Sequence, residues 1–417
     1  MKRNYGIVIM IMVVFFVISF LTNILGPIIP DIIKSFSLSL TLVSLLPFSF
    51  FIAYGFMSIP SGTLVERLGE KSVLTGSFAL AFVGALAFAL VPRYAIAIVS
   101  LFIIGSGMAA LQVALNPLLR VAGGEEHYAF NMVMVQFVFG AASFISPRVY
   151  TYMVEHIGNP SGNNPLIALL ANVVPQEMAW VSLYWIFAAV SLLMLVFMLM
   201  VQLPPVTLKD DEKVGAWETY RSLLKNRVVL LFFIGVFCYV GTEQGIANWI
   251  SQYLAAYHNV NPQKYGALVV SRFWGFFTLG ALPCLLLLKF IDARKVLLIY
   301  GLGAVTCLVL ALSGTAGMSA MAFSLTGFFL APLWSLVFSI GLNSISHHHG
   351  AFSGILCTAI IGGAIVPVII GSLGDVFGLR VGLFFLFGTL AYIISIGIWA
   401  NPLIANKTIR LKQKKNG

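Results

Sequence analysis

Long apolar stretches alternate with short polar interruptions along the whole chain. A transmembrane helix needs about 20 mostly apolar residues, and charges, Pro–Gly clusters and polar runs divide the sequence into twelve stretches of roughly this length. The pattern predicts an all-α polytopic membrane protein with twelve spans. The first stretch is too long for a signal-peptide core, so we expect it to stay attached. The stretches run approximately over residues 6–34, 42–65, 72–92, 95–122, 129–156, 177–202, 228–256, 262–288, 295–313, 317–345, 351–373 and 379–404.

The composition supports a membrane protein. Apolar residues make up 60% of the chain and charged residues 9%, against about 45–50% and about 25% in soluble domains, so soluble enzymes are excluded. Cys238, Cys284, Cys307 and Cys357 lie in apolar runs without the spacing of a disulfide framework or a metal site, and we expect no metal. A membrane enzyme would need clustered acids, His or Cys, and the sequence offers only residues 347–349.

The net charge of +10 could suggest a nucleic-acid partner, but the placement of the charges favours membrane topology. With the N-terminus in the cytoplasm, 18 Lys and Arg residues fall inside and 4 outside, as the positive-inside rule requires. Residues 203–227 are the only long, charge-dense interior segment. We therefore expect a six-helix half over 1–202, a cytoplasmic linker over 203–227, and a second half over 228–417 with a basic cytoplasmic tail. The tail is expected to set the topology and to be solvated, with binding of anionic membrane lipid as the alternative.

An internal repeat relates the two halves. An offset of 223 residues superimposes four identical pairs at equivalent depths, and the order of the spans matches. A six-plus-six repeat predicts a transporter whose halves rock about a site near the midplane. The pairs are Pro60 with Pro283, Leu74 with Leu297, Gly140 with Gly363, and Ala141 with Ala364.

The loop after the second stretch carries a specific motif. Gly62, Glu66, Arg67, Gly69 and Lys71 follow the pattern Gly-x-Leu-x-acid-Arg-x-Gly-x-Lys. In this pattern the chain resembles the major facilitator superfamily, whose loop usually has Asp where Glu66 stands. The resemblance implies that the acid and bases pair between spans and hold the outward-facing state.

Three further stretches, 111–117, 237–243 and 361–375, resemble the fucose permease (fucose:proton symporter) family within that superfamily. Proton-coupled fucose permeases carry acids at the positions of Asn23 and Gln112. Members of the glucose/galactose type have Asn and Gln there, so this subgroup is the better match. The resemblance implies transport of a neutral sugar driven by a proton or sodium gradient.

Glu243 is the only acid near the centre of a span. An ionisable group in hydrocarbon is costly and marks a functional position, so we expect Glu243 to couple transport to H⁺ or Na⁺. Gly241 and Gly245 flank it and could loosen the helix and free carbonyl groups for a cation. The alternatives are a permanently neutral Glu243 or a fixed pair with Arg272 of the next span.

Amide and aromatic side chains are the candidates for the substrate. Gln112 and Asn116 are four residues apart and share one helix face, and amides both donate to and accept from sugar hydroxyls. Trp334, in the repeat partner of the fourth span, is the candidate for packing against the sugar ring. Arg272 is a candidate for binding an oxygen atom of the substrate. The further polar candidates are Asn23, Gln136, Gln244 and Asn248.

These features together predict uptake of a neutral monosaccharide by a monomeric secondary transporter in a bacterial cytoplasmic membrane. No catalytic residue and no cofactor is expected beyond the coupling ion. Two alternatives stay open. An uncoupled facilitator remains because one acid is the minimum for coupling, and an exporter of amphipathic drugs or lipids would suit the Phe- and Met-rich spans.

Overall fold

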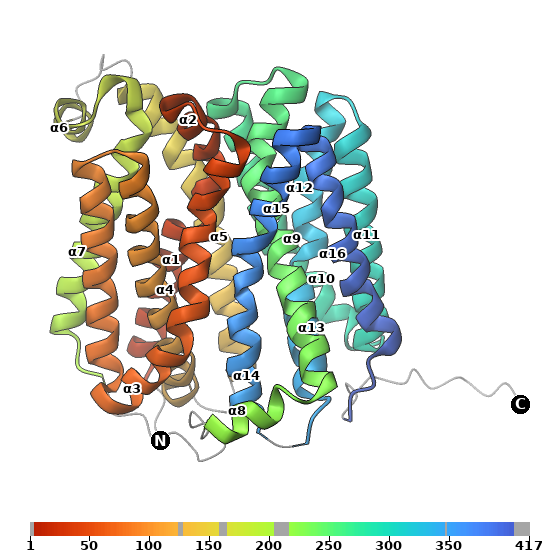
Figure 1. Cartoon of the computed structure of the whole chain (residues 1–417). Helices are drawn as coiled ribbons and strands as arrows, with labels where there is room; N and C mark the ends of the chain where they lie inside the picture. The colour runs from red at the N-terminus through yellow and green to blue at the C-terminus, as the bar shows by residue number, and fades with distance from the viewer. Residues whose placement is uncertain (1–3, 124–127, 158–164, 204–216, 347, 404–417) are drawn as a thin grey trace, which may run out of the picture.

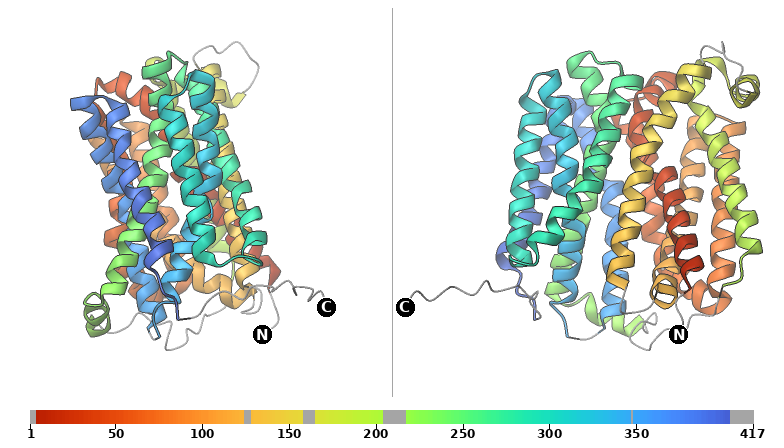
Figure 2. Two further views of the ribbon diagram at one scale, coloured as in Figure 1. Left: turned by 90° about the vertical axis from the view of Figure 1, so that its right-hand side faces the viewer. Right: turned by 180° about the vertical axis from the view of Figure 1, so that it is seen from behind.

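A computed structural model of the chain describes residues 4–123, 128–157, 165–203, 217–346 and 348–403. All regular elements in these ranges are helical, as the sequence predicts. Helices α1–α7 lie on one side of the bundle and α9–α16 on the other (Figure 1). The start of α1 and the end of α16, the described parts nearest the chain ends, lie at the same face in all views (Figure 2).

The first group of helices covers the six stretches expected in the N-terminal part. Its elements are α1 (Tyr5–Thr22), α2 (Leu25–Phe36), α3 (Leu40–Leu90), α4 (Tyr94–Gly123), α5 (Tyr128–Ile157), α6 (Pro165–Val173), η2 (Gln176–Val181) and α7 (Ser182–Met200). The short α6 and η2 lie at the face opposite the chain ends (Figure 1).

The second group covers the other six stretches. Its elements are α8 (Trp217–Leu223), α9 (Arg227–His258), η4 (Pro262–Gly266), α10 (Ala267–Leu287), α11 (Ala293–Ser313), α12 (Ala316–Leu330), α13 (Leu333–Leu342), α14 (His349–Thr358), η5 (Ala359–Ile361), α15 (Gly362–Phe377) and α16 (Leu379–Trp399). Helix α8 falls within the predicted linker.

The expected spans correspond closely to these helices. Within the described residues, eleven helical segments are long and apolar enough to cross a membrane. The remaining predicted span is α5, a helix of 30 residues, which is about 45 Å long at 1.5 Å per residue. Helix α5 packs between α1 and α10, where a further span belongs.

The first span is broken into α1 and α2. Both Asn23 and Ile24 lie between the two helices. Pro27 lacks an N–H group and its ring clashes with the carbonyl of the residue four positions before it, which is Asn23. The break therefore lies one turn before Pro27.

The second and third spans join at a single residue. Helix α3 runs through both, and Gly69 is its non-helical residue, with φ 78° and ψ 159°. Residues with a side chain avoid this region of backbone conformation, which explains a glycine at this position. The motif expected to form a loop is therefore a tight joint between two helices.

Candidate functional site

Glu243 lies within α9, and each of its carboxylate oxygens accepts a hydrogen bond from a neighbouring side chain. The Tyr239 hydroxyl donates to Oε2 at 2.6 Å, and Gln244 Nε2 donates to Oε1 at 3.1 Å. Tyr239 stands four residues before Glu243 and so occupies the same helix face. Glu243 is half-buried, whereas Tyr239 and Gln244 are buried. The carboxylate is thus held in place and partly accessible.

The expected loosening of α9 around this acid is absent. The helix is continuous from Arg227 to His258, so Gly241 and Gly245 free no carbonyl groups. Side chains of α15 fill the space beside them, because an added Cβ would meet Val366 at the first glycine and Ile370 at the second. These glycines let α9 and α15 pack closely, which is a common use of small residues between membrane helices.

Trp334 joins the Glu243 cluster through Tyr239. The two ring centroids are 5.9 Å apart and the planes are inclined at 50°. Trp334 also stacks on Phe338, one turn later in α13, at 5.5 Å. Trp334 is half-buried, so part of the indole surface is free to contact a ligand.

Gln112 in α4 makes a contact that the sequence did not reveal. Its Nε2 donates to the hydroxyl of Tyr54 on α3 at 3.2 Å. Tyr54 is buried, and its ring lies 6.1 Å from the ring of Phe51. Asn116 lies one turn beyond Gln112 and is half-buried. Tyr54 and Tyr239 therefore extend the candidate site, one from each group of helices.

The two clusters approach each other at Gly363. An added Cβ there would lie 3.2 Å from both Phe51 Cδ1 of the first group and Gln244 Cγ of the second. Gly140, which the 223-residue offset pairs with Gly363, also faces the other group, because an added Cβ would clash with Thr278. Both members of this repeat pair thus lie where the two groups of helices touch.

Asn23 lies at the break between α1 and α2. Its Nδ2 donates to Ser143 Oγ of α5 at 2.8 Å, and Ser143 Oγ is 2.6 Å from Ser19 Oγ. Asn23 is buried, and its Oδ1 has no hydrogen-bond partner among the described residues. This orphan acceptor is suited to a hydroxyl or a cation.

Asn248 provides a complementary orphan donor. Its Nδ2 is buried without a partner in the described part of the chain. Gly26 of α2 lies against the backbone of Ala247 and Asn248, so the broken first span meets α9 next to this amide. Gln136 of α5 is half-buried and takes no part in the contacts that join the two clusters.

Arg272 does not take the place expected for it. The side chain is exposed on α10 and forms no ion pair with Glu243 among the described residues. Trp249 and Trp274 are almost fully buried. Trp274 packs edge-on against Phe277 in α10 at 5.3 Å, so both tryptophans pack within the protein.

The motif around the α3 joint makes a polar contact with α7 through Lys71. Lys71 Nζ donates to the Leu199 carbonyl at 3.0 Å, near the end of α7, where a cation is favoured by the helix dipole. Arg67 is exposed and Gly62 is buried. The Glu66 side chain lies outside the described part of the structure, so its predicted pairing stays a prediction.

No cluster of three His, Cys, Asp or Glu residues that could hold a metal occurs among the residues the structure describes. The four cysteines are free thiols, as their sequence context indicates. His347 lies outside the described residues. The chemistry of the site therefore rests on amides, phenols, one indole and one carboxylate.

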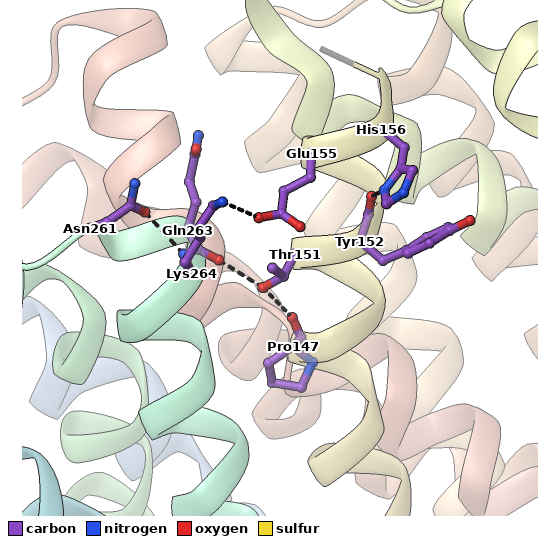
Figure 3. Close-up of polar contacts among 8 residues, drawn as sticks. All are labelled: Pro147, Thr151, Tyr152, Glu155, His156, Asn261, Gln263 and Lys264. Carbon is purple, nitrogen blue, oxygen red and sulfur yellow. Dashed lines mark hydrogen bonds and ion pairs between the residues drawn. The ribbon is translucent and has the colours of Figure 1, made fainter. Parts of the chain in front are cut away.

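The two groups of helices meet closely at the face opposite the chain ends, which we call the closed face. Thr151 Oγ1 of α5 donates to the Gln263 carbonyl of η4 at 2.7 Å, and Lys264 forms an ion pair with Glu155 at 2.8 Å (Figure 3). Deeper in the bundle, Ser271 Oγ of α10 donates to the Phe144 carbonyl of α5 at 2.7 Å. No described hydrogen bond or ion pair joins α4 to α13.

Known transporters resemble the chain over nearly its whole length. It is 28% identical over 414 residues to a glucose/galactose transporter of Brucella abortus, covering 95% of each chain. It is 25% identical over 380 residues to the L-fucose-proton symporter of Escherichia coli, covering 87% of this chain and 86% of the relative. These relatives are transporters and not enzymes.

Solved structures share the fold. The fucose:proton symporter of E. coli in its outward conformation matches with a TM-score of 0.67 at 21% identity, covering 94% of this chain and 98% of that one. A bacterial homologue of the lysosomal transporter Spinster, facing inward, matches with a TM-score of 0.75 at 15% identity, covering 95% and 98%. The family model of the Major Facilitator Superfamily matches residues 11–356. The chain therefore belongs to the major facilitator superfamily of membrane transporters.

Proposed function

We propose that the protein takes up a neutral monosaccharide of the fucose, glucose or galactose type, driven by a proton or sodium gradient. The observation that carries this proposal is the approach of two polar clusters at Gly363. One cluster is Gln112 with Tyr54, and the other is Glu243 with Tyr239 and Trp334. The relatives named as glucose/galactose transporters and as an L-fucose-proton symporter support the choice of substrate class.

The side chains match the chemistry of a sugar. Sugar hydroxyls both donate and accept hydrogen bonds, and so do the amides of Gln112 and Asn116 and the hydroxyl of Tyr54. The C–H face of a pyranose packs well against an aromatic plane, which the half-buried Trp334 offers. An exporter of amphipathic compounds has no use for this set of amides, so sugar is the favoured cargo.

Coupling is assigned to Glu243. A driving cation needs a site whose charge or occupancy changes during transport, and neutral Asn23 and Gln112 cannot release a proton. The carboxylate of Glu243 either carries H⁺ or binds Na⁺, and no resident cofactor is needed. An arriving cation must displace or share a hydrogen bond from Tyr239 or Gln244, which links cation binding to the aromatic side of the sugar site through Trp334.

The conformation supports alternating access. The positive-inside bias favours a cytoplasmic location for both termini and for residues 203–227, in the inner membrane of a bacterium. With this orientation the closed face is the outer one, which supports the proposal of an inward-facing state of a monomeric transporter. In the other state the two groups of helices would separate at the closed face and meet at the opposite one.

Transport into proteoliposomes tests the proposal. Purified protein would be offered radiolabelled fucose, glucose and galactose, with a proton gradient, a sodium gradient or neither. We expect accumulation of at least one sugar above its equilibrium level with one of the gradients. Uptake that only equilibrates would identify a facilitator. Transport of a labelled amphipathic compound without transport of any sugar would overturn the proposal.

A further inference from the structure

A carboxylate of the second group of helices binds the beginning of a helix in the first group. Asp375, near the end of α15, accepts hydrogen bonds from the backbone N–H groups of Leu40 at 2.7 Å and Thr41 at 2.8 Å, which start α3. The Thr41 hydroxyl also donates to Asp375 at 2.5 Å. These residues are more than 330 positions apart, so the contact joins the two groups directly.

The start of α3 depends on this carboxylate. The first N–H groups of a helix have no partner within the helix and need an outside acceptor. The hydroxyl of Ser39, the residue before the helix, accepts from the Leu42 N–H at 3.2 Å. Asp375 satisfies two of the remaining groups, and its negative charge is also favourable at the positive end of the helix dipole. Separation of the groups would leave these donors to water.

Further polar contacts surround the same face. Asp31 of α2 accepts from the Tyr150 hydroxyl of α5 at 2.7 Å and from Gln263 Nε2 of η4 at 2.9 Å. The ion pair between Lys264 and Glu155 lies next to Gln263 (Figure 3). That pair is largely exposed, and such pairs contribute little. Asp375 is exposed as well, but it accepts from two backbone N–H groups that have no partner within their helix, and Asp31 is buried.

We propose that Asp375 is a positioning residue that sets an equilibrium between two forms of the protein. In one form the two groups of helices meet at the closed face, and in the other they separate there. Asp375 acts at the start of α3, which is one end of the second span. The motif from Gly62 to Lys71 lies at the other end of that span. The proposal rests on the transport cycle inferred above. Loss of the negative charge shifts the protein toward the form in which this face is open.

Thiol accessibility measures that equilibrium without any sugar or gradient. Ser44 of α3 is fully buried and lies beside Gly371 of α15, so a cysteine at position 44 reacts only when α3 and α15 separate. The reporter Ser44→Cys would be placed in a chain whose four native cysteines are replaced by alanine. The protein in nanodiscs would be treated with a charged maleimide, and the rate of labelling recorded.

Asp375→Asn should raise the labelling rate about 10- to 100-fold, the ratio expected for loss of hydrogen bonds to a charged group. Asp292→Asn is the matched control. Asp292 caps α11 by accepting from the Arg294 N–H at 2.9 Å, but it does so within the second group. The control should leave the rate unchanged.

Two more variants keep the test decisive. Thr41→Val removes only the hydroxyl contact and should raise the rate about 3- to 10-fold, and Asp375→Glu should restore most of the slow labelling. Equal labelling in Asp375→Asn and the parent, or an equal increase in Asp292→Asn, would overturn the proposal. Because no transport is measured, failure here is distinct from failure to find a transported sugar.

Discussion

A carboxylate that already holds two hydrogen bonds must give up part of that arrangement when it takes up a cation. Glu243 is in this position, since Tyr239 and Gln244 each donate to one of its oxygens. Tyr239 also contacts Trp334. Movement of the phenol on cation binding would therefore reach the indole proposed to pack against the sugar, which gives coupling a physical route over a short distance.

Glu243→Gln should abolish accumulation against a gradient, because the amide cannot exchange charge with the coupling ion. Exchange of labelled for unlabelled sugar across equilibrated membranes should survive, since exchange does not require the return of the empty carrier. Both assays would use proteoliposomes. Glu177→Gln serves as the control because Glu177 is exposed in η2. Full accumulation by Glu243→Gln would remove this residue from the coupling site.

Gln112→Ala should weaken sugar binding roughly 5- to 100-fold. A neutral hydrogen bond contributes about 0.5–1.5 kcal/mol and a stranded buried partner costs about 1–3 kcal/mol, at about 1.4 kcal/mol per factor of ten. Tyr54 would lose the hydrogen bond that Gln112 now donates to it. Titration calorimetry of the folded variant measures the effect, with exposed Gln202→Ala as the control. Unchanged affinity would place the sugar elsewhere.

The sequence singled out individual polar residues in the spans but not their partners. Glu243 stood out as the one acid near a span centre, and its four-residue spacing from Tyr239 is a signal that could have identified that partner. No comparable signal pairs Gln112 with Tyr54, because they lie on different helices. Arg272 was misplaced because a guanidinium in an apolar stretch can face outward as well as inward.

At the scale of elements, the positions at which helices are interrupted shape the bundle. The first span breaks at Asn23, and the second and third meet at Gly69. Proline and the motif glycine indicated both places to within one turn. The expected opening of α9 at Gly241 and Gly245 is wrong, because glycine permits either a distorted backbone or a close helix contact, and sequence alone does not decide between them.

Gly69→Ala should lower the free energy of unfolding by about 1–3 kcal/mol, the cost of placing a residue with a side chain in this backbone region. Gly76→Ala is the matched control, since Gly76 is helical and an added Cβ meets nothing within 4 Å. The control should be neutral or slightly stabilising. Thermal unfolding of both variants in one detergent provides the comparison. Equal stability would contradict the strained joint.

At the scale of the whole molecule, membrane orientation follows from the distribution of 18 against 4 basic residues. We expect a cysteine at Leu169, exposed on α6, to react with an impermeant maleimide added to intact cells. A cysteine at Leu224, exposed after α8, should react only after the membrane is opened. The reverse pattern would invert the topology and place the closed face on the cytoplasmic side of the membrane.

Fold class and span order were predictable because a local run of apolar residues marks each span. The closed face was not predictable, since it depends on pairs such as Asp375 with Leu40 that no local pattern links. The chain sequence permits both states of a transporter. Only the arrangement in space reveals which face is closed.

The two orphan amide atoms, Asn23 Oδ1 and Asn248 Nδ2, have a consequence for the kind of ligand that the site favours. Each buried polar atom without a partner costs about 1–3 kcal/mol. A ligand that donates to Asn23 Oδ1 and accepts from Asn248 Nδ2 would recover this cost when it binds. A molecule whose groups both donate and accept hydrogen bonds meets both requirements at once.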